Sequence, residues 1–113
     1  MKKALINIDY TVDFIADHGA LTCGKPGQQI EPELVRITKQ FIENGDYVVF
    51  AIDLHKAGDT YHPDTKLFPP HNIEGTDGRK LFGELERFIK RTNIETMYIG
   101  WIRRDIARLP GRI

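Results

Sequence analysis

The sequence predicts an α/β fold in which parallel strands alternate with helices. Two short apolar runs, Ala4–Ile8 and Tyr47–Ile52, each end at an aspartate, as strands buried on both faces often do. The stretches between and after these runs carry apolar residues at helical spacing. The order strand, helix, strand, helix, strand implies parallel strands joined by right-handed crossovers in one layered sheet.

The first half of the chain contains one strand and one main helix. The strand Ala4–Ile8 is followed by residues 10–30, which we expect to form a loop because they include three glycines and a proline. A helix is expected to begin at Glu31, because Pro32 and the neighbouring acids suit a first turn. Gly45 is expected just past the end of this helix.

The second half repeats the pattern after a polar stretch rich in histidine and aspartate. The strand Tyr47–Ile52 leads into this stretch, and Thr96–Ile99 is expected to begin a third strand. Between them, Gly78–Arg91 is expected to be helical. Its apolar residues share one helical face: Leu81, Leu85, Phe88 and Ile89.

Composition excludes several classes of function. The chain has 113 residues, 41% of them apolar, which suits one small domain. Its formal net charge is zero and its basic residues are scattered, so neither nucleic acid nor an anionic membrane surface is an expected partner. No apolar stretch is long enough to span a membrane. The single cysteine, Cys23, excludes an internal disulfide and favours a reducing cytoplasm.

The polar stretch after the second strand holds candidate metal ligands. Asp53 and His55 alternate on an extended segment, so both side chains can point to the same side. His71 follows Pro69 and Pro70, which stiffen the approach. Two imidazoles and a carboxylate suit a divalent zinc, iron or manganese ion, and spacing alone also fits a polar surface loop. Two residues of the intervening loop could add a ligand: His62 and Asp64.

Other residues could complete a site at the carboxyl ends of the strands, where ligands bind in open α/β sheets. Asp9 ends the first strand, as Asp53 ends the second, and could be a general base or a structural acid that caps nearby amides. Cys23 has no histidine beside it in sequence, so an inert loop cysteine is favoured. Phe14 and Phe68 could line an aromatic pocket or pack in the core.

Three motifs in this order resemble a known family. The segments ALINIDYTVDF, AIDLH and KLFPPHNIEGTDGRKL resemble the nicotinamidase/pyrazinamidase branch of the isochorismatase-like cysteine hydrolases, and the resemblance runs from about residue 3 to residue 90. It implies a three-layer α/β fold around a parallel sheet, of which about three strands and two main helices are present here. It also implies a metal-dependent hydrolysis of nicotinamide to nicotinate and ammonia through a cysteine thioester, a reaction of pyridine nucleotide salvage.

The resemblance assigns roles to the residues that match the motifs. Asp9 corresponds to the aspartate that takes the thiol proton, and Phe14 and Phe68 correspond to aromatics beside the substrate ring. The metal in this family is expected to act mainly as a template for the pyridine nitrogen and water. Its ligands would be Asp53, His55 and His71, with Asp64 as a fourth, acidic ligand.

The resemblance fails in the last part of the chain. The family uses a lysine about thirty residues after the last metal ligand, where this chain has Arg103, and a nucleophilic cysteine further on. Cys23 does not match that motif, so no nucleophile is assigned. We therefore expect residues 1–98 to be the N-terminal part of an isochorismatase-like domain and residues 99–113 to be a tail foreign to the family.

The composition of the tail suggests a shifted reading frame. Residues 100–113 hold half of the eight arginines and no lysine or glutamate. Permitted codons for residues 98–113 can be chosen so that a neighbouring frame encodes YWMDKTRYSAFAGTD, which resembles the lysine segment of the family. The sequence thus predicts a frameshifted, truncated product after about residue 97. Such a product would expose apolar sheet surface, be marginally stable and tend to self-associate.

Three functions remain open on the sequence. The first is a nicotinamidase-like chain that is inactive alone because it lacks the lysine and the nucleophile. The second is a non-catalytic metal-binding or interaction fragment that docks on intact paralogues. The third is a small α/β enzyme that uses Cys23 itself as its nucleophile.

Overall fold

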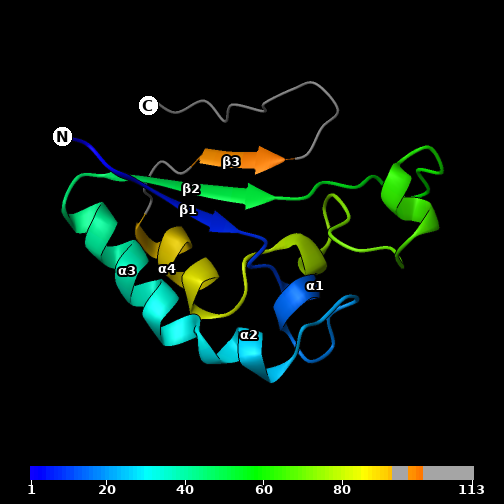
Figure 1. Ribbon diagram of the computed structural model, residues 1–113, viewed down its shortest axis with the longest axis horizontal. Helices are drawn as coiled ribbons and strands as arrows, with labels where there is room; N and C mark the ends of the chain where they lie inside the picture. Colours follow the sequence, from blue (N-terminus) through cyan, green and yellow to red (C-terminus); the bar gives the residue numbers. More distant parts are fainter. Residues whose placement is uncertain (93–96, 101–113) are drawn as a thin grey trace.

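The computed structural model describes residues 1–92 and 97–100 (Figure 1). Its centre is a sheet of three parallel strands in the order β1-β2-β3, where β1 is Ala4–Ile8, β2 is Tyr47–Ile52 and β3 is Met97–Gly100. The register pairs Ile6 with Val49 and Val49 with Met97. The parallel sheet and the bounds of the first two strands are therefore as the sequence predicts.

Two main helices make the crossovers between the strands. Helix α3, Glu31–Glu43, has Pro32 in its first turn and ends before Gly45, whose φ of 73° only glycine adopts at no steric cost. Helix α4, Glu84–Thr92, begins six residues later than expected. A 3₁₀ turn, Asp77–Arg79, and the positive φ of Gly83 interrupt the backbone there, and a continuous right-handed helix cannot include that conformation.

The expected loop over residues 10–30 contains two short helices. Helix α1 covers Val12–Ile15 and helix α2 covers Lys25–Gln29, with Pro26 in its first turn. Another 3₁₀ turn, Pro63–Lys66, lies in the histidine-rich stretch. Helices of four or five residues are too short to show an apolar periodicity, which is why the sequence pattern missed them.

Helices α3 and α4 cover one face of the sheet (Figure 1). The core cluster on that face combines Val48, Phe50 and Ile52 of β2 with Val35 of α3 and with Leu85 and Ile89 of α4. Of the three layers expected, the described residues thus form the sheet and one helical layer.

The opposite face of β1 is open to solvent. Ile6 is 57% exposed and Ile8 is 66% exposed, whereas Asn7 between them is buried. The prediction that this strand is buried on both faces is therefore wrong for the chain as described, because only one face of β1 meets a helix.

The predicted tail lies almost entirely outside the described residues. Ile99 and Gly100 complete β3, two residues beyond the boundary expected at residue 98. Residues 101–113, including Arg103, are not described, so the frameshift stays a prediction. Within the described ranges, no helix combines the length and apolarity needed to cross a bilayer.

Candidate metal centre

Two backbone hydrogen bonds at the carboxyl end of β2 bring the two predicted histidine ligands together. His55 and Ile73 form an isolated parallel bridge, in which the His55 N–H donates to Asn72 O (3.1 Å) and the Glu74 N–H donates to His55 O (2.8 Å). The imidazole rings of His55 and His71 lie 4.5 Å apart between centroids. Both histidines are buried, so their positions are fixed by the surrounding chain.

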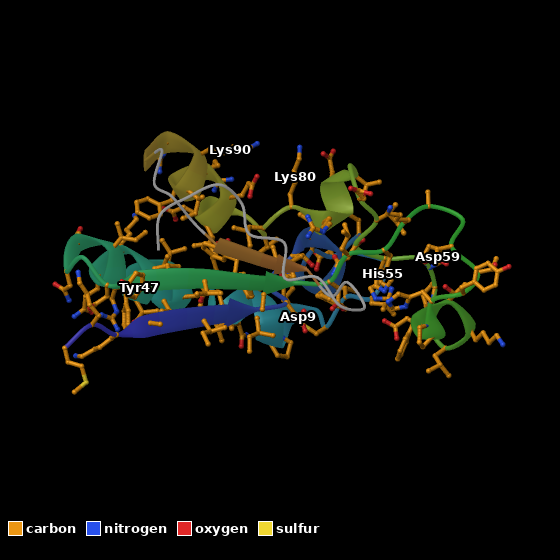
Figure 2. All side chains as sticks on the ribbon, turned by 90° about the horizontal axis from the view of Figure 1, so that it is seen from above. Asp9, Tyr47, His55, Asp59, Lys80 and Lys90 are labelled. Carbon is orange, nitrogen blue, oxygen red and sulfur yellow. The ribbon has the colours of Figure 1, made fainter. Side chains whose placement is uncertain are left out.

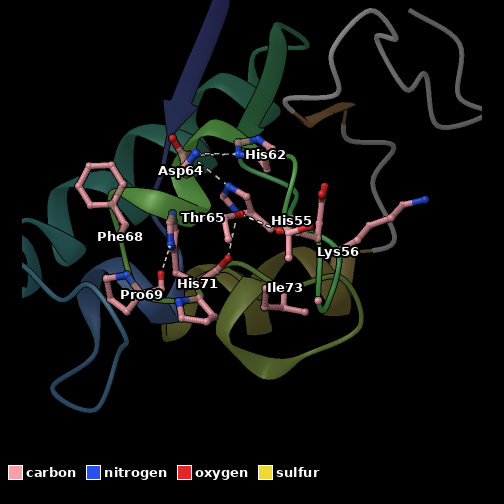
Figure 3. A pocket seen from close by; sticks show the side chains of 13 residues that line it. His55, Lys56, His62, Asp64, Thr65, Phe68, Pro69, His71 and Ile73 are labelled. Atoms are coloured by element: carbon pink, nitrogen blue, oxygen red, sulfur yellow. Dashed lines mark hydrogen bonds and ion pairs between the residues drawn. The ribbon is translucent and has the colours of Figure 1, made fainter.

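Hydrogen bonds to carbonyl groups set the tautomer of both rings (Figure 3). His55 Nδ1 lies 2.9 Å from His71 O, and His71 Nδ1 lies 2.8 Å from Pro69 O. Because a carbonyl oxygen only accepts, each Nδ1 carries the proton and each neutral ring keeps its lone pair on Nε2. This arrangement is the usual outer support of a histidine that ligates a metal through Nε2.

Five side chains form two overlapping groups of potential ligand atoms. One group is Asp53, Asp64 and His71, and the other is His55, His62 and Asp64; within each group the ligand atoms lie within 4.8 Å of one another. Asp64, the acidic ligand that the resemblance implied in the intervening loop, belongs to both groups. Its Oδ2 lies 3.1 Å from His55 Nε2 (Figure 3).

His62 joins the cluster in a different state from the other two histidines. Its Nδ1 accepts a hydrogen bond from the Asp64 N–H at 3.1 Å, so its Nδ1 lone pair is already engaged. Its ring lies 4.4 Å from that of His55. His62 therefore orders the loop that carries Asp64, in addition to standing near the ligand atoms.

A pocket of about 150 Å³ opens beside the cluster. The rings of Phe14 and Phe68 lie 5.4 Å and 6.2 Å from the His71 imidazole between centroids, and Phe14 packs against the core cluster without lining the pocket. Phe68 is nearly half exposed, so its ring borders the pocket and not the core. Residues that line the pocket include His55, His62, Asp64, Phe68, His71 and Ile73 (Figure 3).

Asp9 lies at the same end of the sheet as His55 (Figure 2). The residue as a whole is exposed and takes a φ of 60°, uncommon outside glycine, asparagine and aspartate. Partial burial of its carboxyl group raises the pKa of Asp9; the charge of Asp53 raises it further, and His71 lowers it. Asp9 is thus electrostatically coupled to two of the predicted ligands.

Asp9→Asn is expected to stabilise the metal-free chain near neutral pH. The folded state binds the Asp9 proton more tightly than the unfolded state, so wild-type stability falls as pH rises from about 3.8 through the folded pKa. Asparagine also suits the positive φ and removes that charge. Urea unfolding with chelator present should give the variant a larger free energy of unfolding than the wild type at neutral pH, and this difference should shrink in acid. A difference that does not change with pH would contradict a raised pKa of Asp9.

A buried network that sequence analysis missed supports His71. Asn72 is fully buried with a φ of 46°, and its Oδ1 accepts from Thr11 Oγ1 at 2.9 Å. The Asn72 N–H donates to Asp13 Oδ2 at 2.8 Å, and a Cβ at Gly78 would collide with that carboxylate. The only sequence indication was an asparagine, a residue that tolerates this conformation, directly after a predicted ligand.

Cys23 stands apart from this pocket. It is exposed, its N–H donates to Phe14 O (2.8 Å), and its sulfur packs where a Cβ of Gly27 would be. It lies two residues before α2, so a helix start is nearby, contrary to expectation. Cys23 is not among the residues that line the pocket.

Comparison with known proteins relates the chain to one family, although no family model matches it. It is 65% identical over 85 residues to PncA of Bacillus subtilis (strain 168), an uncharacterized isochorismatase family protein, and that match covers 75% of this chain and 46% of PncA. This chain is homologous to the isochorismatase family. A crystal structure of nicotinamidase/pyrazinamidase PncA from Bacillus subtilis matches with a TM-score of 0.85 and 53% identity, covering 95% of this chain and 60% of that one.

A second structure supports the isochorismatase-like fold. The pyrazinamidase/nicotinamidase of Streptococcus mutans UA159 matches with a TM-score of 0.80 and 49% identity, over 86% of this chain and 55% of that chain. The chain thus spans about half to three-fifths of the length of the isochorismatase relatives it matches. The predicted family resemblance and fold class are confirmed.

Proposed function

We propose that this chain forms the metal-binding and substrate-orienting part of a nicotinamidase-type amide hydrolase site. The ligands are Asp53, His55, Asp64 and His71, and the ion is divalent zinc, iron or manganese. The donor set fits, because two neutral imidazoles and two carboxylates suit these ions.

One contact supports the metal proposal above all others. His55 Nδ1 donates to a carbonyl, so in the neutral form of the ring the lone pair of Nε2 faces Asp64 Oδ2 at 3.1 Å. Two acceptors at this distance repel unless a proton or a cation lies between or beside them. His55 and Asp64 would hold a divalent cation there, which would remove that repulsion, and the carboxylates of Asp53 and Asp64 would balance its charge.

The remaining residues of the site suit a flat, neutral aromatic amide. Phe68 borders the pocket, and Phe14, which packs against the core cluster, also lies against the His71 ring, so both add apolar surface beside that imidazole. When bound, the metal supplies a Lewis-acid anchor for a ring nitrogen and for water. Asp9, whose pKa is raised, takes a proton more readily than an ordinary aspartate and is the proposed base.

The chain alone is proposed to bind metal without hydrolysing nicotinamide. Its only cysteine, Cys23, is not among the residues that line the pocket, and Arg103 stands where the family resemblance places a lysine. The site therefore holds no thiolate to attack an amide carbon. Activity of the kind named for the relatives requires a nucleophile that these residues do not provide.

Two measurements on the full chain test this function. Calorimetric titration of the chelator-treated protein with Zn²⁺ is expected to give one ion per chain, and ammonia release from nicotinamide is expected to stay at background. The intact Bacillus subtilis relative serves as the positive control for the ammonia assay. Absence of metal binding would overturn the proposed metal site. Ammonia release that Cys23→Ala abolishes would overturn the proposal that the chain does not hydrolyse nicotinamide.

A further inference from the structure

Strand β1 forms an open edge of the sheet. It pairs with β2 on one side, and within residues 1–92 and 97–100 no strand lies on its other side (Figure 1). The sequence of β1, ALINI, contains neither a charged residue nor a proline. Natural proteins usually protect an edge strand with such residues, and β1 has none, so its own sequence does not oppose pairing with another strand.

The pairing with β2 fixes which backbone groups face the open edge. The Tyr47 N–H donates to Lys3 O and the Asp9 N–H donates to Ala51 O, both at 2.9 Å. Odd-numbered residues of β1 therefore bond to β2, and alternation along the strand turns the N–H and C=O groups of Ala4, Ile6 and Ile8 toward the open edge. All three residues are exposed.

We propose that a second copy of this chain pairs with this edge, β1 against β1 in antiparallel orientation, about a twofold axis through Ile6. An isologous contact of this kind is self-complementary. Ile6 would exchange both of its backbone hydrogen bonds with Ile6 of the other copy. Ala4 of each copy would do the same with Ile8 of the other, so that the outward groups of the strand are satisfied.

Charges at the two ends of the strand favour this orientation. Lys2 and Lys3 precede β1, and Asp9 follows it. Antiparallel pairing about Ile6 places Lys3 of one copy beside Asp9 of the other, twice per dimer, whereas a parallel pair would place like charges together. Opposite charges across a strand pair stabilise it, and like charges weaken it.

The dimer would also bring apolar side chains into contact. Ala4, Ile6 and Ile8 lie on the same face of the strand, and the two isoleucines are 57% and 66% exposed. Across the proposed axis, Ile6 meets Ile6 and each Ile8 meets Ala4, which gives aliphatic cross-strand pairs. The inference does not require a bound metal, although one of the flanking charges, Asp9, is also the proposed base.

Sedimentation equilibrium of the untagged 113-residue chain tests the dimer directly. The wild type is expected to dimerise, and Ile6→Lys, which sets two lysines face to face at the axis, is expected to raise the dimer Kd by about tenfold or more. Ile30→Lys is the matched control, because Ile30 is 52% exposed and lies outside β1. A monomeric wild type, or equal weakening by both substitutions, would overturn the proposal.

A charge cycle tests the register. Asp9→Asn should raise the dimer Kd severalfold in the wild type, by removing an attraction. In a chain that already carries Lys3→Glu, the same Asp9→Asn substitution should lower the dimer Kd severalfold, because it removes the repulsion between two acidic side chains across the axis. Hydrogen exchange should also show the Ile6 and Ile8 amides protected only at dimer concentrations. The same sign in both backgrounds, or unprotected Ile6 and Ile8 amides in the dimer, would exclude this register.

Discussion

His71→Ala is expected to lower the affinity for Zn²⁺ by about 100-fold or more. His71 is 4% exposed, and its Nδ1 proton is held by Pro69 O, so its Nε2 is a fixed donor that no solvent molecule replaces in the same geometry. Loss of a hydrogen-bond partner that holds a ligand in place lowers metal affinity by about 10–100-fold. Loss of the ligand itself should therefore lower it by an amount at the upper end of this range or beyond it. Competition with a chromophoric chelator measures the change.

The matched control for this substitution is His18→Ala. His18 is exposed and belongs to neither group of potential ligands, so its loss should leave Zn²⁺ affinity unchanged. Circular dichroism of both variants checks that the fold is retained. If the two substitutions changed the affinity equally, or if His71→Ala bound as tightly as the wild type, the proposed ligand set would be wrong.

Leu85→Ala is expected to reduce the free energy of unfolding by about 2–5 kcal/mol, because it leaves a cavity in the core. Leu85 of α4 is fully buried against the central strand, and it belongs to the same cluster as Phe50. A domain of this size has a total stability of only about 5–15 kcal/mol. The variant should therefore unfold at a much lower urea concentration.

Leu67→Ala is the control, because Leu67 is 71% exposed. The same deletion of atoms should there change stability by no more than about 0.5 kcal/mol. Urea unfolding followed by circular dichroism compares the two. Equal effects would mean that α4 does not pack on the sheet in solution as it does in the structure.

The sequence predicted the parts of the fold whose pattern is long or sharply bounded. The strands Ala4–Ile8 and Tyr47–Ile52 were predicted residue by residue, because an apolar run between polar residues has few alternatives. Helix α3 was predicted from its start, because proline and acids mark a first turn. Helix α4 was placed too early, because apolar spacing continues across Gly83 although the helix does not.

The sequence predicted which residues form the candidate site but not the hydrogen bonds that hold them in place. Family-like motifs located Asp53, His55, Asp64 and His71, and the structure brings all four together. Long-range contacts such as the bond from Thr11 to Asn72, 61 residues apart, leave no local pattern in the sequence. The tautomers of His55 and His71 depend on backbone carbonyls, which every residue has, so sequence alone could not assign them.

The bridge between His55 and Ile73 has an evolutionary consequence. Because the chain leaves and returns at one point, the part of the excursion before Pro69 can change in length or composition while both buried imidazoles keep their hydrogen bonds to the carbonyls of Pro69 and His71. Asp64 and Phe68 both lie on that excursion. Exchange of this one segment could therefore retune ion preference and ring selectivity together, while the scaffold beneath it stays the same.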